Sequence, residues 1–158
     1  MTDMFTRKKR SEIMSRIRSR GNAATELRFI KIMRLRRITG WRRGSKLPGQ
    51  PDFVFPKNRV AVFIDSDFWH GNPREFRLPR SNLRYWRRKI LSNKERDRRV
   101  NRTLRAEGWR VLRFWQSSLA CMASVTARLQ HALCGPGFRA RENRGRCPCL
   151  RQGAAQNL

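Results

Sequence analysis

The sequence places two short apolar runs, residues 52–55 and 59–64, on either side of a tight connection. Pro56 stops the first run and a turn leads into the second, so the pair predicts an antiparallel β-hairpin. Asp52 begins the first predicted strand and Asp65 ends the second. Antiparallel pairing of these strands therefore brings the two carboxylates near one another.

The remaining apolar residues predict helices around this hairpin and one more strand. Apolar side chains at helical spacing predict a helix over 24–37, one or two helices over 82–107 and another helix over 119–133. Residues 109–115 alternate large apolar and basic side chains, which is typical of a strand. The order of these elements predicts an α/β domain.

The charge of the chain points to a polyanionic partner. The 158 residues include 38 Lys and Arg against 11 Asp and Glu, which gives a formal net charge of +27. Nucleic acid fits such a surplus best, because Arg suits bidentate contacts to phosphate and guanine. The longest apolar run, residues 60–64, is far too short to cross a bilayer, and no signal pattern is present. We expect no membrane segment, and charge alone predicts binding without predicting catalysis.

Composition divides the chain into one domain and two basic appendages. Residues 1–20 are polar and basic, although Met14 and Ile17 form part of an apolar group at helical spacing. Residues 21–134 hold the predicted domain. Residues 135–158 contain few apolar side chains and are expected to form a disordered basic tail.

Carboxylates are scarce, so their gathering at the hairpin has two interpretations. Asp52, Asp65 and Asp67 all lie at predicted strand ends. They can cap turns and balance the local charge. They can also hold Mg²⁺, which prefers clustered carboxylate oxygens and can polarise a phosphodiester.

The segment Phe68-Trp69-His70 adds a candidate general base, and it adds aromatic side chains that are candidates for insertion into DNA. A single histidine is often an ordinary structural residue, but near a metal-activated water His70 is the best general base in the sequence. In an extended segment, adjacent side chains face opposite ways, so Phe68 or Trp69 should be exposed. An exposed aromatic ring can unstack a base step of DNA.

Several motifs, taken in order and spacing, resemble the very short patch repair endonucleases. They are Leu47-Pro-Gly-Gln-Pro-Asp-Phe53, Phe68-Trp69-His70, Asn93-Lys-Glu-Arg-Asp-Arg98 and Gly108-Trp-Arg-Val-Leu112. Ser11-x-x-Met14-x-x-Ile17 and Thr25-Glu26 also fit, so the resemblance covers about residues 6–134.

The resemblance implies a restriction-endonuclease-like fold of the PD-(D/E)XK type, with a mixed sheet of about four strands flanked by helices. It implies a Mg²⁺-dependent enzyme that nicks double-stranded DNA 5′ of the T in T:G mismatches, the products of 5-methylcytosine deamination. It also implies a monomer that acts in the bacterial cytoplasm at the nucleoid. A cytosine-5 methyltransferase system and mismatch-repair proteins are the implied partners.

The resemblance also assigns roles to single residues. Asp52 matches the Mg²⁺-binding aspartate, and the carbonyl of Ile64 matches a second ligand. His70 matches the catalytic histidine, Asp97 the acid that orients it, and Glu26 a glutamate that organises metal-bound water. The residues that match apolar groups intercalating beside the mismatch are Met14, Ile17, Phe68 and Trp69.

Two departures from the family pattern change these expectations. The positions of the family's structural zinc ligands read Asp67, Asn72, Arg74 and Ser117, so a structural zinc is not expected. Asp65 replaces a second active-site histidine, which makes it a further candidate for catalysis and metal binding beside Asp52. The alternatives are a restriction-type endonuclease linked to a modification system and a non-catalytic DNA-binding protein of the same fold.

Overall fold

The computed structural model describes residues 23–79 and 82–134. The predicted arm at 1–20, with Met14 and Ile17, and the predicted tail at 135–158 lie outside the described residues. None of the described helices has the length and apolar character needed to cross a membrane.

The described residues form a mixed three-stranded sheet in the order β1-β2-β3. Strands β1 (Phe53–Phe55) and β2 (Val60–Asp65) are antiparallel, as the hairpin pattern predicts. Strand β3 (Arg110–Trp115) pairs in parallel with the other edge of β2. A single bridge between Arg42 and Val54 adds a short contact beyond β1. The described sheet thus has three strands rather than the four or so implied by the resemblance, and the α/β class is confirmed.

The helices agree closely with the apolar periodicity. The predicted first helix is a π-helical turn, η1 (Ala23–Leu27), that continues as α2 (Arg28–Leu35). Residues 82–107 form one helix, α3 (Leu83–Ala106), and the C-terminal helix is α4 (Met122–Cys134). Two short 3₁₀ turns complete the described elements, namely η2 (Pro56–Asn58) between β1 and β2 and η3 (Ser117–Ala120) after β3.

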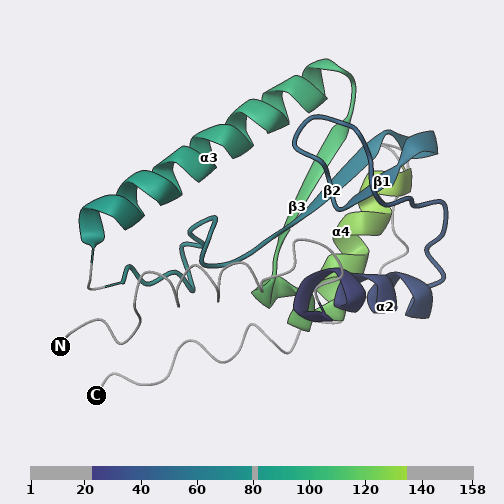
Figure 1. The fold of residues 1–158 in the computed structure, drawn as a ribbon. Coiled ribbons are helices and arrows are strands. Elements are labelled where there is room, and N and C mark those ends of the chain that lie inside the picture. Colours follow the sequence, from purple (N-terminus) through teal and green to yellow (C-terminus); the bar gives the residue numbers. More distant parts are fainter. Residues whose placement is uncertain (1–22, 80–81, 135–158) are drawn as a thin grey trace.

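The sheet separates two apolar layers, with α3 on one face and α2 and α4 on the other (Figure 1). The larger core joins the sheet to α2 and α4 through buried side chains such as Phe29, Phe53 and Leu129. The smaller core lies under α3, where Ala61, Phe63 and Leu104 are buried together. Because side chains alternate along a strand, residues of β2 are divided between these two layers.

This alternation places polar residues on the face that α3 covers. Asp65 follows Ala61 and Phe63 on that face, and the pairing of β2 with β3 puts Arg113 directly opposite Phe63. On α3, Asp97 lies seven residues before the buried Leu104 and so faces the same layer. The fold therefore brings two acids and one arginine to the end of the sheet where β2 stops.

The segment after β2 is not extended, contrary to the expectation for Phe68-Trp69. Residues 67–71 form turns, and the backbone N–H of His70 donates to the carbonyl of Ser66 at 3.2 Å. The turns bring both aromatic rings against Trp86, and each is half-buried. The prediction of an extended segment was wrong here, because the chain turns directly after Asp65.

Candidate active site

The turn before β1 positions Asp52. Gly49 and Gln50 both have left-handed backbone angles, with φ of 75° and 50°, and the Gln50 N–H donates to the Leu47 carbonyl at 2.9 Å. A Cβ at position 49 would collide with the side chain of Val100 on α3, so only glycine fits there. The Pro-Gly-Gln-Pro-Asp motif therefore forms a tight turn that packs against α3 and places Asp52 directly before β1.

The carboxylate of Asp52 binds the neighbouring strand with one oxygen only. Oδ2 accepts a hydrogen bond from the backbone N–H of Ile64 at 2.7 Å. Within residues 23–79 and 82–134, no other residue donates to Oδ1, and the backbone N–H of Asp52 itself lies close enough to its carboxylate to favour the charged form. Asp52 lines two adjoining hollows, one shared with Glu26 and the other with His70 and Asp97.

Burial raises the pKa of Asp52 from 3.8 to about 6. Desolvation is the largest cause, and the negative charges of Glu26 and Asp65 add to it. The hydrogen bond from Ile64 opposes the shift by stabilising the charged form. Asp52 is therefore a carboxylate that a cation would stabilise strongly.

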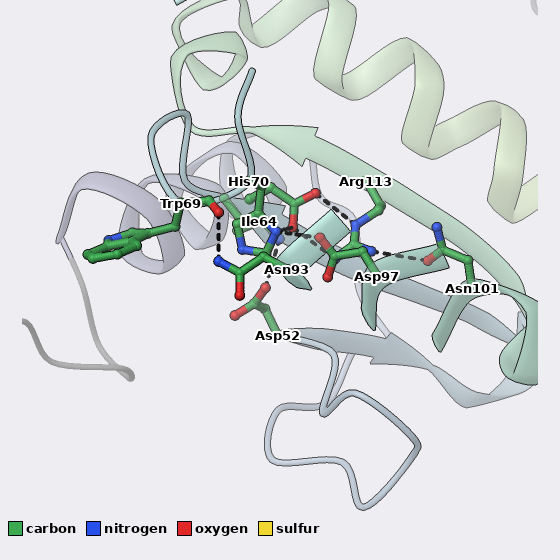
Figure 2. Close-up of polar contacts among 9 residues, drawn as sticks. Asp52, Ile64, Trp69, His70, Asn93, Asp97, Asn101 and Arg113 are labelled. Carbon is green, nitrogen blue, oxygen red and sulfur yellow. Dashed lines mark hydrogen bonds and ion pairs between the residues drawn. The ribbon is translucent and has the colours of Figure 1, made fainter. Parts of the chain in front are cut away.

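His70 and Asp97 form a short polar contact in the hollow that Asp52 lines. His70 Nδ1 lies 2.6 Å from Asp97 Oδ2, whereas Asp65 Oδ1 is 3.7 Å from the same nitrogen. Asp97 comes from α3 and His70 from the turn after β2, so the pair joins two layers of the fold (Figure 2). An aspartate that accepts from Nδ1–H leaves Nε2 as the basic nitrogen.

Asp65 lines the same hollow as Asp52, as the hairpin predicts, and Arg113 holds its carboxylate there. Arg113 Nε donates to Asp65 Oδ2 at 2.7 Å, and Nη2 donates to Oδ1 at 3.0 Å. Both carboxylate oxygens are thus occupied by one guanidinium, in the fork geometry that Arg and carboxylates prefer. Each Asp65 oxygen thus carries a charged hydrogen bond from Arg113, whereas Asp52 has no such cationic partner among the described residues.

Glu26 lies on the other side of Asp52. It is 5 % exposed, and Arg43 donates to its Oε2. Its place in the π-helical turn η1 directs the side chain toward the hollow that Asp52 also lines. The sequence offered Thr25-Glu26 only through the family resemblance, since nothing in its periodicity marks Glu26 as special.

The two aromatic residues beside His70 belong to a larger aromatic group. The Phe68 ring lies 5.1 Å from Trp69, 5.6 Å from Phe76 and 5.2 Å from Trp86. The buried Asn93 side chain donates to the Trp69 carbonyl at 2.8 Å and so fixes the backbone next to His70. Figure 2 shows the Trp69 indole directed away from the His70–Asp97 pair.

Hydrogen bonds join the residues at the positions of the family's zinc ligands. Asp67 accepts from the Ser117 backbone N–H at 3.0 Å and from its hydroxyl at 2.8 Å. The buried Asn72 side chain donates to Asp67 and accepts from the Arg74 backbone N–H at 3.1 Å. This network ties the turn that carries His70 to the segment that follows β3.

The oxygen donors around Asp52 fit a Mg²⁺ ion that is held by few protein ligands. In the described part of the chain, no three His, Cys, Asp or Glu side chains gather as a metal site. Mg²⁺, however, keeps several waters and is commonly held by one or two carboxylates together with substrate phosphates. A half-buried carboxylate with a free oxygen and a raised pKa fits that mode of binding.

Comparison with known proteins matches the chain to DNA endonucleases. Residues 2–75 match the family model described as DNA mismatch endonuclease Vsr. A type II nicking enzyme, V.XorIIP, of Xanthomonas oryzae pv. oryzae is 37% identical over 137 residues, which cover 84% of this chain and 98% of that protein. The chain belongs to the Vsr endonuclease family.

Other Vsr-family relatives agree with this assignment. The DNA mismatch endonuclease Vsr of Escherichia coli K12 is 33% identical over 143 residues, covering 87% of this chain and 91% of that protein. The nicking enzyme V.NmeDIP of Neisseria meningitidis serogroup C is 37% identical over 119 residues, covering 74% and 80%. The chain is thus a DNA endonuclease of the mismatch-repair and nicking class, and DNA is its partner.

Three residues that form hydrogen bonds around the candidate site had no role predicted from the sequence, although Asn93 belongs to one of the motifs that carry the resemblance. Arg113 and Asn101 lie among the polar groups at the end of the sheet, and Asn93 supports the turn before His70. A signal for Arg113 was present in the sequence. Arg113 lies on the same face of its strand as the apolar side chains of Trp109, Val111 and Trp115, which are spaced two residues apart. An arginine on an apolar strand face is expected to meet an acid.

Proposed function

We propose that this Vsr-family chain is a Mg²⁺-dependent endonuclease that nicks one strand of DNA 5′ of the T in T:G mismatches. The observation that carries the proposal is the unequal charge balance at the site. Glu26 pairs with Arg43, while Asp65 and Asp97 share Arg113. Within the described residues, Asp52 alone among these four acids has no cationic partner. In a chain with a formal net charge of +27, a buried acid without a cationic partner favours binding of a metal ion at Asp52.

Asp52 and the Ile64 carbonyl would hold the ion. Mg²⁺ bound there would polarise the scissile phosphate and lower the pKa of a nearby water molecule. His70 would accept the proton of the attacking water at Nε2, while Asp97 holds Nδ1 and stabilises the imidazolium. Glu26 faces the hollow on the other side of Asp52, where it would order water.

The aromatic group beside His70 supports recognition of a weakened base step. The Phe68 and Trp69 rings are half-buried and rest on Trp86, so a rigid surface lies next to the candidate site. We propose that Phe68 and Trp69, with Met14 and Ile17 from the N-terminal arm, insert beside the mismatch. The proposed setting is a cytoplasmic monomer that repairs deaminated sites made by a cytosine-5 methyltransferase and works alongside mismatch-repair proteins.

The test uses end-labelled duplexes that differ only in one base pair. One duplex carries a T:G mismatch in a methylation-type context, and the other is fully paired. Wild-type protein with Mg²⁺ should nick 5′ of the mismatched T, and Asp52→Ala should abolish the nick. Glu95→Gln, an exposed acid of α3, is the matched control and should nick like wild type.

The other outcomes separate the alternatives. Equal cutting of the paired duplex would indicate a restriction-type enzyme instead. Tight binding without cutting at any Mg²⁺ concentration would indicate a non-catalytic DNA-binding protein. Nicking by Asp52→Ala at the wild-type rate would overturn the assigned role of Asp52.

A further inference from the structure

Among the lysines and arginines that the structure describes, Arg113 alone contacts two acids of the candidate site, and the proposed mechanism does not use it. Its guanidinium lies 4.7 Å from the centre of the Phe63 ring, which is its direct neighbour on β2. The side chain is 20% exposed, and the side chains of Asp65 and Asp97 are 8% and 16% exposed. The charges are thus largely removed from water. In such a buried environment the geometry of a hydrogen bond has a large effect on its energy.

The hydrogen bonds of Arg113 fix two carboxylates at once. Besides its two bonds to Asp65, Arg113 Nη2 donates to Asp97 Oδ1 at 3.0 Å. Its Nη1 donates to the Asn101 side-chain oxygen at 3.2 Å, one turn of α3 beyond Asp97. A planar guanidinium with acceptors on three residues has little freedom to rotate.

This arrangement decides which acid His70 faces. Arg113 holds Oδ1 of Asp97, so Oδ2 remains for the His70 Nδ1 at 2.6 Å. Asp65 is the competing acceptor at 3.7 Å, and its two oxygens are already engaged by the same guanidinium. The hydrogen bonds thus run from Arg113 through Asp97 to His70, and an Asp97 carboxylate that accepts from Nδ1–H favours the tautomer in which Nε2 can accept a proton.

We propose that Arg113 is a positioning residue that orients Asp97, and through it His70, and keeps Asp65 out of the metal site. The proposal rests on the proposed role of His70 as the general base. Asp65 then serves as the anchor of Arg113 rather than as a second metal ligand.

The first experiment measures the histidine directly. In ¹⁵N-histidine-labelled protein without metal or DNA, His70 of the wild type should show one tautomer, protonated at Nδ1 with a strongly deshielded proton. Arg113→Met should lose that proton signal or give a mixture of tautomers. Arg110→Met, at the exposed start of the same strand, is the matched control and should keep the wild-type spectrum.

The second experiment measures nicking at saturating DNA and Mg²⁺. Arg113→Met should lower kcat about 10- to 100-fold with little change in KM, a loss typical of residues that orient a reacting group. Arg113→Lys should recover part of the rate, because one ammonium can still reach Asp97 or Asp65. The Arg110→Met control should retain the wild-type kcat.

A double variant covers the case in which Arg113→Met fails to fold, since that change leaves Asp65 buried without a cation. Asp65→Asn/Arg113→Met removes both charges and should fold, yet its kcat should remain low. The same double variant with wild-type kcat and an unchanged His70 spectrum would overturn the proposal. If wild type itself does not nick, the proposed function fails, whereas the spectrum still tests whether Arg113 orients His70.

Discussion

Replacing Asp52 by Asn should make the metal-free protein more stable and inactive. The Asp52 carboxylate is desolvated, and its pKa is raised from 3.8 to about 6. Asn has nearly the same shape and keeps an oxygen that can accept the hydrogen bond from Ile64 N–H. The substitution therefore removes the charge while preserving the contact to β2.

The raised pKa sets both the size and the pH dependence of this effect. Between pH 3.8 and about 6 the folded state binds more protons than the unfolded state, so the free energy of unfolding falls as pH rises. The charged Asp52 costs about 1 kcal/mol at about pH 4.5 and about 3 kcal/mol at about pH 7.5. Asp52→Asn should recover these amounts, so its advantage should grow by about 2 kcal/mol across the interval.

Urea unfolding with a chelator present measures the effect at both pH values. Glu95→Gln is the control for loss of one negative charge, because Glu95 is exposed on α3. Its free energy of unfolding should change little and with the same sign at both pH values. An Asp52→Asn protein that is no more stable than wild type at pH 7.5, or whose gain is independent of pH, would refute the argument from burial.

Further predictions follow from the surrounding contacts. Asp67→Asn should lower the free energy of unfolding by about 1 to 2 kcal/mol in urea titrations, since Ser117 loses a charged acceptor. It should also slow nicking, because the affected turn carries His70. Trp69→Ala should fold normally but lower mismatch nicking, with a smaller rise in 2-aminopurine fluorescence beside the mismatch. Arg99→Gln/Arg102→Gln, on the exposed face of α3, should reduce the salt slope of DNA binding by about 2 and leave kcat unchanged.

The elements of the domain were predictable because each has a local cause in the sequence. Apolar periodicity gives α3 within one residue of its start, and the Pro56 break with a turn gives the hairpin. The π-helical start of the first helix was not predictable, since the spacing that suggests a helix does not distinguish four-residue from five-residue hydrogen bonding. The turn after Asp65 was not predictable either, because the adjacent aromatic residues there suggested an extended chain.

The candidate site was predictable only where a single element carries its own signal. Asp52 and Asp65 were placed correctly at the strand ends, but their proximity in the hairpin did not make them partners. Which acid remains free depends on the register of β3 against β2, because that register puts Arg113 opposite Phe63 and within reach of Asp65. The sequence of the hairpin alone cannot predict this contact, because β3 begins forty-five residues after the end of β2 and follows α3 in the chain. The proposed metal-binding role of Asp52 therefore depends on a contact made elsewhere in the chain, so the Arg113 variants test the site more sharply than changes to Asp65 alone.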